Sequence, residues 1–405
     1  MEMNNVPAAE RLHIAFFGCR NAGKSSLVNA VTGQELSVVS GVGGTTTDPV
    51  TKTMELLPLG PVVIIDTPGF DDEGELGEIR VNRTKRILNK TDIGVLVINA
   101  QTGMTEADMC LKKIFAEKKI PYVIAVNKTD IVSGAISADF SDADTEIIFV
   151  SAKTGKNIDS LKEKIGKMLP EDNEKKSLAG GLVKPGESAI LVCPIDESAP
   201  KGRLILPQQR MIRDLLDMGV CAMVTQPEGL SAVLADMKTP PAAVITDSQV
   251  LAAVSGTVPG EIPLTTFSIL MARDRGFLET AVSGIAAASR LHEGDKILMA
   301  EGCTHHRQCN DIGTVKIPRL LQKYCGCGLV FETCSGADFP ENLSGYSMVI
   351  HCGGCMNTER EVKYRMKCTL DMGIPFTNYG ITLAQVTGTL ERTVRCFPEI
   401  HGLLN

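Results

Sequence analysis

Eight residues near the start of the chain have the types and spacing needed to hold nucleotide phosphates. The segment Gly18-Cys-Arg-Asn-Ala-Gly23-Lys24-Ser25 follows an apolar run and leads into apolar residues at helical spacing. Glycines let backbone N–H groups curve around phosphate oxygens, the lysine reaches the terminal phosphates, and the serine hydroxyl ligates Mg²⁺ at a helix start. We therefore predict nucleotide contacts from Gly18, Asn21, Ala22, Gly23, Lys24, Ser25 and Ser26, with Lys24 also catalytic.

Two later segments indicate that the base is guanine. Asn127-Lys128-Thr129-Asp130 follows an apolar run, and an aspartate at its end accepts hydrogen bonds from guanine N1 and N2. Adenine offers no such pair of donors, so a site of this kind rejects ATP. Ser151-Ala152-Lys153 follows the next apolar run and completes the pocket. We predict GTP and GDP as ligands, bound by Asn127, Lys128, Asp130, Ser151, Ala152 and Lys153.

The segments that would respond to the γ-phosphate also have recognisable sequences. Asp66-Thr-Pro-Gly69 ends an apolar run, where Asp66 would hold Mg²⁺ through water and the Gly69 amide would sense the γ-phosphate. Gly44-Thr45-Thr46-Thr47-Asp48 resembles the first switch of the translation-factor-like GTPases that include Era and MnmE. That resemblance implies that Thr46 is the second Mg²⁺ ligand, with Thr45 as the alternative. We predict Thr46 and Gly69 to act in catalysis with the phosphate-loop lysine.

Hydrolysis needs help that the second switch does not supply. Phe70 stands after Gly69, where Ras-type GTPases carry a glutamine that orients the attacking water. In the MnmE-like group an asparagine of the phosphate loop coordinates K⁺, and Asn21 has that position here. The resemblance implies slow, K⁺-stimulated turnover, suited to a switch; an ordinary loop role for Asn21 is the alternative.

A second set of chemically capable residues lies in the last quarter of the chain. It consists of Cys303-Thr-His305-His306, Cys325-Gly-Cys327 and His351-Cys352-Gly-Gly-Cys355. The first and third groups follow apolar runs, and the carboxyl ends of parallel strands bring distant residues together. Thiols and imidazoles suit zinc, and glycines between thiolates let N–H groups approach inorganic sulfide. From spacing alone, zinc and an iron-sulfur cluster remain equally open.

The arrangement Cys303-x-His305, 45 residues, His351-Cys352-x-x-Cys355 resembles the iron-sulfur motif of the HydF family of [FeFe]-hydrogenase maturation GTPases. The segment 196–208, DESAPKGRLILPQ, resembles that family's middle domain, so the resemblance spans the chain. It implies a [4Fe-4S] cluster on Cys303, Cys352 and Cys355, which leaves one iron with an exchangeable ligand. His305 and His351 are further contacts of that cluster or form hydrogen bonds within their loops.

The remaining thiols and imidazoles of this region lie outside that motif. We interpret three of them as structural or locally redox-active rather than as ligands: Cys325, Cys327 and Cys334. We assign no role to His306, Cys309, Cys368 and Cys396.

Apolar runs that alternate with helical patterns throughout the chain predict an α/β fold with a mainly parallel sheet in the first domain. The runs interpreted as strands are 14–17, 62–65, 95–98, 122–126, 147–150, 189–192, 222–225, 243–245, 296–300, 328–331, 348–350 and 374–377. We expect three domains: a phosphate-loop GTPase domain at 1–170, a small α/β dimerisation domain at 186–260 and an α/β iron-sulfur domain at 261–405. The charged, glycine-rich stretch 171–185 is interpreted as a linker. Dimerisation of the middle domain is implied by the family resemblance.

Composition limits the classes of partner. The 405 residues carry a net charge of -7 without a block of Lys and Arg, which argues against binding to nucleic acid or to an anionic membrane. The N-terminal segment lacks the apolar core of a secretory signal, so we expect a cytoplasmic protein. Thirteen cysteines in a reducing compartment favour metal binding over disulfides.

The resemblance implies a scaffold or carrier that accepts the diiron subcluster precursor from radical-SAM maturases and delivers it to apo-[FeFe]-hydrogenase, with the GTPase as a switch. Two alternatives remain. One is a redox-sensing regulatory GTPase with an iron-sulfur cluster. The other is a translation or RNA-modification GTPase with a structural zinc module, which the acidic balance disfavours.

Overall fold

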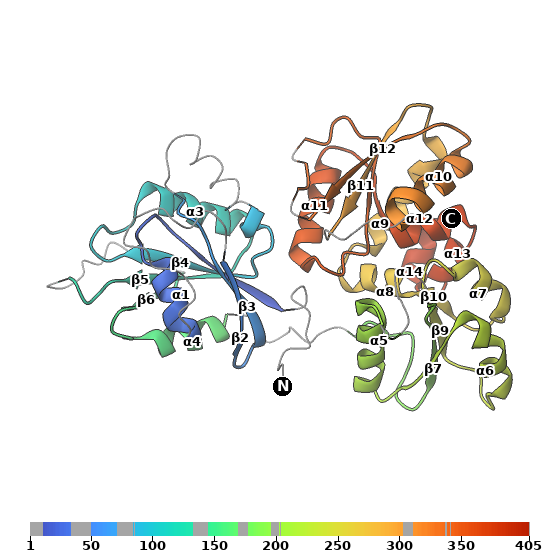
Figure 1. Cartoon of the computed structure of the whole chain (residues 1–405), viewed down its shortest axis with the longest axis horizontal. Coiled ribbons are helices and arrows are strands. Elements are labelled where there is room, and N and C mark those ends of the chain that lie inside the picture. Colours follow the sequence, from blue (N-terminus) through green and yellow to red (C-terminus); the bar gives the residue numbers. More distant parts are fainter. Residues whose placement is uncertain are drawn as a thin grey trace. The chain divides into compact units, whose positions relative to one another are not determined.

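The computed structural model describes residues 11–33, 50–70, 84, 86–132, 145–168, 177–195, 202, 204–302, 311–336, 338–340 and 342–404. It divides the chain into two compact units, Met1–Glu174 and Lys175–Asn405. Figure 1 colours the first unit blue to green and the second green to red. Each unit is described by itself.

The first unit is built on a six-stranded sheet in the order β2-β3-β1-β4-β5-β6. All neighbouring strands are parallel except β2 and β3. The strands are β1 Leu12–Phe17, β2 Val50–Leu56, β3 Gly60–Asp66, β4 Ile93–Asn99, β5 Tyr122–Asn127 and β6 Ile147–Phe149. In this unit, Figure 1 labels the helices α1 Lys24–Thr32, α3 Glu106–Glu117 and α4 Ile158–Gly166.

Side chains of the first unit's sheet alternate between two cores. In β1, Ile14 and Phe16 pack in a cluster that also contains residues of α1 and α4. Ala15 and Phe17 point the other way, into a cluster with Leu111 of α3. Successive side chains of a strand point to opposite faces, so an apolar run without polar interruption is buried on both. The apolar runs of the sequence therefore correspond to the central strands.

The second strand of this sheet was not predicted. Exposed residues alternate with covered ones along β2, VTKTMEL, and Lys52 and Leu56 are its only buried residues. It lies at the edge and pairs antiparallel with β3. An edge strand with one exposed face needs no continuous apolar run, so the sequence pattern lacked the signal.

The second unit contains two four-stranded parallel sheets, in the orders β10-β9-β7-β8 and β12-β11-β13-β14. The strands are β7 Ser188–Val192, β8 Cys221–Thr225, β9 Ala243–Thr246, β10 Leu264–Thr266, β11 Lys296–Glu301, β12 Val330–Ser335, β13 Met348–His351 and β14 Phe376–Asn378. The helices are α5 Leu206–Asp217, α6 Leu230–Asp236, α7 Leu251–Thr257, α8 Phe267–Asp274, α9 Leu278–Ile285, α10 Ile317–Cys325, α11 Glu359–Asp371, α12 Tyr379–Val386, α13 Leu390–Val394 and α14 Pro398–His401. The α/β class with a parallel phosphate-loop sheet is confirmed.

The two sheets of the second unit have the same topology. In each, the second strand lies on one side of the first, and the third and fourth lie on its other side. Residues 262–282 and 374–394 are identical at nine of 21 positions. Both copies run from a strand into a helix whose N-cap side chain, Thr266 or Asn378, accepts from the N–H three residues later. The second unit is therefore an internal duplication, which we did not recognise from the sequence.

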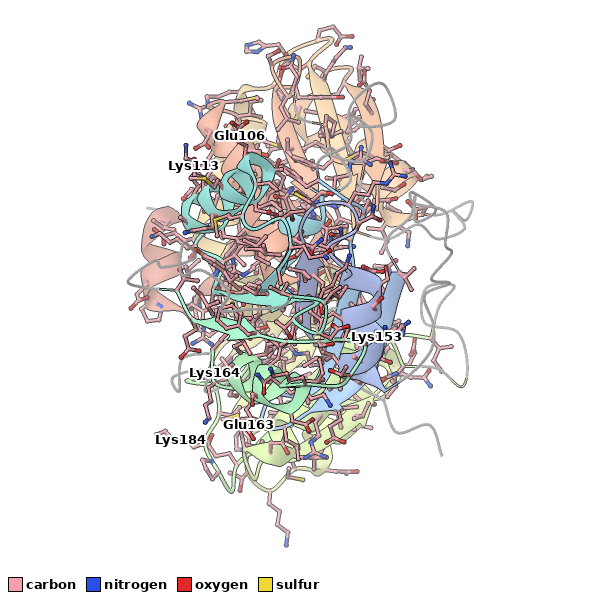
Figure 2. All side chains as sticks on the ribbon, turned by 90° about the vertical axis from the view of Figure 1, so that its left-hand side faces the viewer. Glu106, Lys113, Lys153, Glu163, Lys164 and Lys184 are labelled. Carbon is pink, nitrogen blue, oxygen red and sulfur yellow. The ribbon has the colours of Figure 1, made fainter. Side chains whose placement is uncertain are left out.

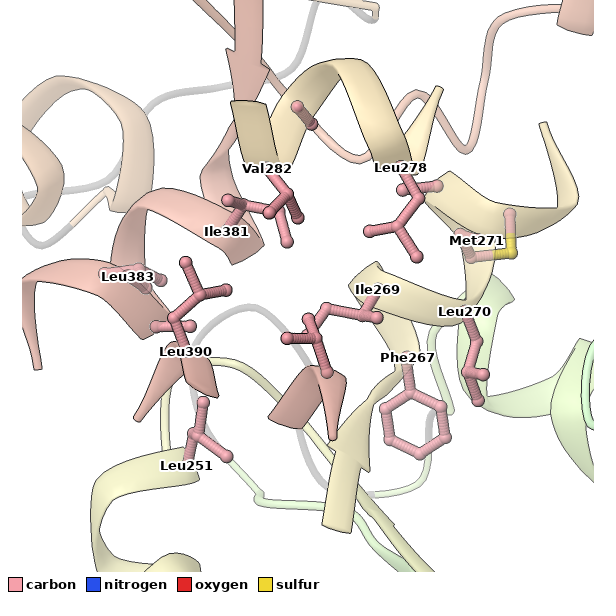
Figure 3. Packing of buried hydrophobic residues seen from close by; sticks show 14 of the residues in the cluster. Leu251, Phe267, Ile269, Leu270, Met271, Leu278, Val282, Ile381, Leu383 and Leu390 are labelled. Carbon is pink, nitrogen blue, oxygen red and sulfur yellow. The ribbon is translucent and has the colours of Figure 1, made fainter. Parts of the chain in front are cut away.

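The two copies pack against each other through equivalent helices. Gly380 of α12 is the counterpart of Ser268 of α8, and a Cβ at Gly380 would lie 2.3 Å from the Ser268 hydroxyl oxygen. Figure 3 shows the counterparts Ile269 and Ile381 in one shared core with Leu278 and Leu390. Strand β10 belongs to the first copy although it lies beyond residue 260. The domain limits stay a prediction.

Candidate functional site

The phosphate loop between β1 and α1 depends on residues with positive φ. These are Gly18 at 142°, Asn21 at 60° and Gly23 at 89°. A Cβ at Gly18 would lie 2.2 Å from the carbonyl oxygen of Val97, and one at Gly23 would lie 2.4 Å from Nδ2 of Asn127. Gly18 therefore allows the loop to approach the backbone of Val97, and Gly23 allows it to approach the side chain of Asn127.

The cationic and hydroxyl groups of the loop are placed at the start of α1. Lys24 is 7% exposed, and its Nζ donates to the carbonyls of Gly18 at 2.9 Å and Cys19 at 2.8 Å. The Ser25 hydroxyl donates to Asp66 Oδ2 at 2.5 Å. Hydroxyl and carboxylate oxygens are ligands that Mg²⁺ prefers. Two of the three residues predicted for Mg²⁺, Ser25 and Asp66, therefore lie together and offer suitable oxygen atoms.

The second switch begins against the phosphate loop. The Phe70 N–H donates to the Gly18 carbonyl at 3.4 Å, and the Thr67 hydroxyl donates to the Phe16 carbonyl at 2.7 Å. These contacts bring Gly69, between them in sequence, to the same edge of the sheet. Thr45 and Thr46 lie outside the described residues, so their roles stay predictions.

The guanine-binding segments are joined to the phosphate loop by Asn127. Its Nδ2 donates to the Ala22 carbonyl at 3.1 Å, and its Oδ1 accepts from the Ala152 N–H at 3.0 Å. Lys128 has a φ of 66°, and its aliphatic stem lies over Gly23. The segments 18–26, 127–130 and 151–153, far apart in sequence, therefore lie together.

The carboxylate expected to recognise guanine is held by a hydroxyl. Ser151 Oγ donates to Asp130 Oδ1 at 2.7 Å, which is the main reason that the pKa of Asp130 lies below its ordinary value. Lys153 and Lys128 lower that pKa to a lesser extent. Lys153 is exposed, and its side chain is labelled in Figure 2. The carboxylate is ionised at neutral pH, as an acceptor of two N–H groups must be.

A buried lysine beneath this site was missed because β2 was missed. Lys52 is 7% exposed, and its Nζ donates to Asn29 Oδ1 at 3.2 Å. Burial lowers the pKa of Lys52, and the Asp66 carboxylate opposes that shift. Lys52 thus joins the strand after the first switch to the helix that starts at the phosphate loop.

The cysteine site forms where β11 and β13 end. These strands are parallel neighbours, with Ala300 paired to His351. Cys352 Sγ accepts from the backbone N–H of Gly302 at 3.1 Å and of Gly354 at 3.3 Å. Gly302 directly precedes Cys303 in sequence. The residue before Cys303 therefore lies beside Cys352. Cys303, His305, His306 and Cys309 themselves lie outside the described residues.

The setting of Cys352 suits the cluster ligand that was predicted there. N–H groups that point at a sulfur stabilise a thiolate, as cluster ligands require. Burial raises the pKa of the Cys355 thiol, and the Arg275 guanidinium opposes that shift. In the part of the chain that the structure describes, no three His, Cys, Asp or Glu side chains converge as a metal site. The third predicted ligand, Cys303, falls outside that part.

His351 has a protein partner for each ring nitrogen. Nδ1 lies 2.7 Å from the Cys352 carbonyl oxygen, which only accepts, so Nδ1 carries the hydrogen. Nε2 faces the guanidinium of Arg365 at 3.3 Å, which only donates. Burial, and next the Arg365 charge, lowers the pKa of His351 to about 3. Of the two roles expected for His351, this arrangement is that of hydrogen bonding within the loop.

A buried arginine on α11 fastens three strand ends and was not predicted. Arg365 is 1% exposed and donates to the Gly336 carbonyl at 2.5 Å and to Glu361 Oε1 at 2.7 Å. It also reaches the Glu301 carbonyl at 3.4 Å. In the sequence, α11 is an amphipathic pattern rich in charge, and nothing in it marks which arginine is buried. The topology alone supplies that information.

A buried glutamate, Glu301, ends β11 beside the cysteine site. Glu301 is 3% exposed and accepts from the Tyr379 hydroxyl at 3.3 Å. Burial raises the pKa of Tyr379 well above its ordinary value, and the nearby Cys352 and Glu301 add to the shift. Tyr379 of α12 therefore lies near both Glu301 and Cys352.

The cysteines outside the motif have the contacts of structural thiols. Cys325 Sγ donates to the Ala288 carbonyl at 3.2 Å, and Cys327 Sγ donates to the Leu291 carbonyl at 3.6 Å. Burial raises the pKa of Cys334 to about 11. These contacts support the structural interpretation of Cys325, Cys327 and Cys334.

Three family models match the chain. Residues 13–128 match the 50S ribosome-binding GTPase model. Residues 178–276 match the hydrogen maturase F dimerization domain, and residues 279–396 match the hydrogen maturase F tetramerization domain. The last two together make up more than half of the 405 residues.

Curated GTPases match about two fifths of the chain. The tRNA modification GTPase MnmE of Paraburkholderia xenovorans is 35% identical over 159 residues, 38% of this chain and 34% of its own length. GTPase Der of Wolinella succinogenes is 34% identical over 176 residues, 40% of this chain and 36% of its own length. The chain thus spans about a third of the length of these relatives.

Among solved structures, a variant of Aquifex aeolicus Era bound to GDP.AlF4- aligns with a TM-score of 0.37 and 22% identity, over 53% of this chain and 93% of that chain. A structure of Era in complex with MgGDPNP and ribosomal RNA aligns with a TM-score of 0.36 and 21% identity, over the same shares.

The described part of the chain contains no helix with the length and hydropathy of a membrane span.

Proposed function

The chain belongs to the hydrogen maturase F family and carries a GTPase domain, and from this premise we propose that it is a cytoplasmic, GTP-regulated carrier of the diiron subcluster of [FeFe]-hydrogenase. In this proposal Cys303, Cys352 and Cys355 hold a [4Fe-4S] cluster. Such a cluster, with three thiolate ligands, supplies one iron with an open coordination position for the cargo. Radical-SAM maturases load the carrier, and apo-hydrogenase receives the cargo.

The observation that carries the proposal is the setting of Cys352. Two backbone N–H groups point at its sulfur, and one of them belongs to the residue before Cys303. Hydrogen bonds of this kind tune cluster sulfurs and are satisfied by thiolate. A structural thiol in this chain, such as Cys325, instead donates to a carbonyl. The site is built to present a negative sulfur.

Activation of apo-hydrogenase tests the carrier role. The full chain, produced together with the two radical-SAM maturases and purified without oxygen, is expected to give hydrogen evolution when mixed with apo-hydrogenase. Cys352→Ser should abolish that activation, because the sulfur is the centre of the site. The matched control is Cys368→Ser, on α11 and outside the motif, which should retain it. A wild type with an intact cluster that never activates apo-hydrogenase would favour the redox-sensor alternative.

The GTPase acts as a switch in this proposal. Asp66 and Gly69 lie against the phosphate loop, where the presence of a γ-phosphate is sensed. We expect the affinity for a radical-SAM maturase to differ at least about tenfold between the GTP-analogue and GDP forms, within the range of typical couplings between sites. Equal affinities and release rates in both forms would contradict the switch.

K⁺ is proposed to assist hydrolysis at Asn21. Asn21 lies within the phosphate loop, between Gly18 and Gly23, and has a φ of 60°. A positive charge near the γ-phosphate stabilises the transition state. Turnover in KCl should exceed turnover in NaCl at least about tenfold, and Asn21→Ala should remove the difference. Equal rates in the two salts would exclude the role.

Self-association is proposed to use β8. This strand is at the edge of its sheet, its sequence CAMVT has no charge, and Val224 is 48% exposed. Edges of this kind pair with a second chain. Val224→Lys in the full chain should shift the dimer to monomer in sedimentation, whereas Leu57→Lys, at an exposed residue of the first unit, should not. A dimer that persists in Val224→Lys would place the interface elsewhere.

A further inference from the structure

The cysteine loop, residues 352–357 of the second copy, is contacted by an arginine of the first copy. Arg275, directly after α8, is 3% exposed, and its Nη1 donates to the Asn357 carbonyl. Asn357 is itself buried, and its N–H donates to the Gly354 carbonyl at 3.0 Å, which closes the turn that contains Cys355. Arg275 therefore binds the 354–357 turn through Asn357, the residue that closes it.

The same asparagine touches the other half of the motif. A Cβ at Gly302 would lie 1.5 Å from Asn357 Oδ1, so the side chain of Asn357 lies directly against Gly302. Gly302 in turn donates to Cys352 Sγ at 3.1 Å. Arg275 therefore contacts Asn357, which lies against Gly302 at the end of β11, and Gly302 contacts Cys352 at the end of β13.

The internal duplication shows that an arginine is not needed at position 275 for folding of the turn. Its counterpart in the second copy is Thr387. Both turns close with the same backbone bonds, Gly276 N–H to the Arg273 carbonyl at 3.0 Å and Gly388 N–H to the Gln385 carbonyl at 3.0 Å. The two glycines each have a φ of 70°. What distinguishes Arg275 from Thr387 is the contact with the cysteine loop.

We propose that Arg275 is a positioning residue of the cysteine site. It joins the segment 178–276, which matches the dimerization domain, to the Cys352–Asn357 loop. It also places a fixed positive charge beside the thiolates. The proposal rests on the cluster-binding function proposed above. A buried guanidinium remains charged at all physiological pH values. Positive charge beside a cluster favours its reduced, more negative state. Arg275 therefore raises the reduction potential and helps to retain the cluster.

Charge and geometry can be separated with two substitutions in the full chain. Arg275→Gln removes the charge, and Arg275→Lys keeps the charge but loses the planar, multi-donor geometry. Each variant is reconstituted with iron and sulfide without oxygen, and the fraction reduced is followed by EPR during a potentiometric titration. Cluster loss to a chelator gives a second readout that does not depend on hydrogenase activity.

We expect Arg275→Gln to lower the reduction equilibrium constant at least tenfold, which is about 59 mV for a one-electron couple. Arg275→Lys should keep most of the wild-type potential but lose its cluster faster than wild type. The matched control is Arg392→Gln, since Arg392 also bridges the two copies, but donates to the carbonyls of Ser255, Val258 and Pro259 instead of to the cysteine loop. The control should match wild type in both readouts.

The outcomes separate this inference from the function on which it rests. A wild type that takes up no iron would overturn the proposed function and the role of Arg275 together. A wild type with a cluster, and an Arg275→Gln variant with the same potential and retention, would overturn the role of Arg275 alone. If Arg275→Gln does not fold, Arg275→Lys decides, because wild-type retention in that variant would contradict the positioning role.

Discussion

The nucleotide site and the cysteine site are assembled in different ways. The phosphate loop, the Asn127–Asp130 segment and the Ser151–Lys153 segment each carry their chemistry within a few adjacent residues. The cysteine site joins the ends of two strands about 50 residues apart and is fixed by Arg275 and Arg365, which come from two further elements. Local motifs therefore describe the first site almost completely, whereas they describe only the ligands of the second.

This difference has a physical cause. Backbone N–H groups bind phosphate through loop conformation, which short runs of glycine determine. A metal cluster also depends on charges and hydrogen bonds around its ligands, and these come from any element that packs nearby. If the two sites are built separately, a substitution in one site should leave the other site unchanged.

The largest effect is expected at Asp130. Asp130→Asn replaces an acceptor by an amide that cannot accept from both guanine N–H groups, so GTP affinity should fall at least about a thousandfold. Xanthosine triphosphate, which offers an acceptor in place of one donor, should bind the variant better than GTP does. Fluorescence titration measures both. The iron content of the variant should equal that of wild type, and a loss of iron would contradict the separation of the two sites.

Arg365 should show how much the cysteine site depends on buried charge. Arg365→Gln leaves Glu361 and three strand ends without their partner, and should lower the free energy of unfolding of the second unit by about 3 kcal/mol. The control on the same helix is Lys363→Gln, at the exposed pair with Glu359, with an expected change below about 1 kcal/mol. Chemical denaturation measures both. Similar losses in the two variants would refute the special role of Arg365.

Two glycines of the cysteine site differ in the space around them. Gly302→Ala would place a methyl group against Asn357, whereas Gly353→Ala meets nothing within 4 Å. We expect Gly302→Ala to destabilise the second unit by about 1 to 3 kcal/mol and to reduce iron uptake. Gly353→Ala, whose added methyl group meets no described atom, should reduce iron uptake less than Gly302→Ala. Equal iron uptake in the two variants would show that the approach of Gly302 to Asn357 is unimportant.

The smallest effect concerns the hydroxyl beside Asp130. Ser151→Ala removes the hydrogen bond that lowers the pKa of Asp130, so GTP affinity at pH 7 should fall about fivefold. A carboxylate with a lowered pKa stays ionised as pH falls. In the variant that pKa returns toward 3.8, so affinity should begin to fall at a higher pH than in wild type. Identical acid-side profiles for wild type and variant would rule out this role for Ser151.

The sequence predicted the central strands of all three sheets, because strands buried on both faces are continuous apolar runs. It did not predict β2, whose alternating pattern reflects one exposed face, or β10, a strand of three residues. In the nucleotide site, the predicted residues that the structure describes lie together. In the cysteine site, Cys352 and the residue before Cys303 meet as expected from the strand ends.

Arg275, Arg365 and Tyr379 could not be predicted as parts of the cysteine site. A buried arginine and an exposed one look alike in an amphipathic pattern, and only the packed structure separates them. The sequence did contain a signal of the duplication, since residues 262–282 and 374–394 are identical at nine of 21 positions. It would have indicated two sheets of equal topology, and a contrast between Arg275 and Thr387.

Metal analysis of the full chain tests the central claim most directly. After reconstitution without oxygen in the presence of iron, sulfide and zinc, we expect about four iron and four sulfide per chain, an EPR signal on reduction, and loss of both in Cys352→Ser. One zinc per chain, with no reducible iron, would contradict the account and favour a GTPase with a structural zinc module.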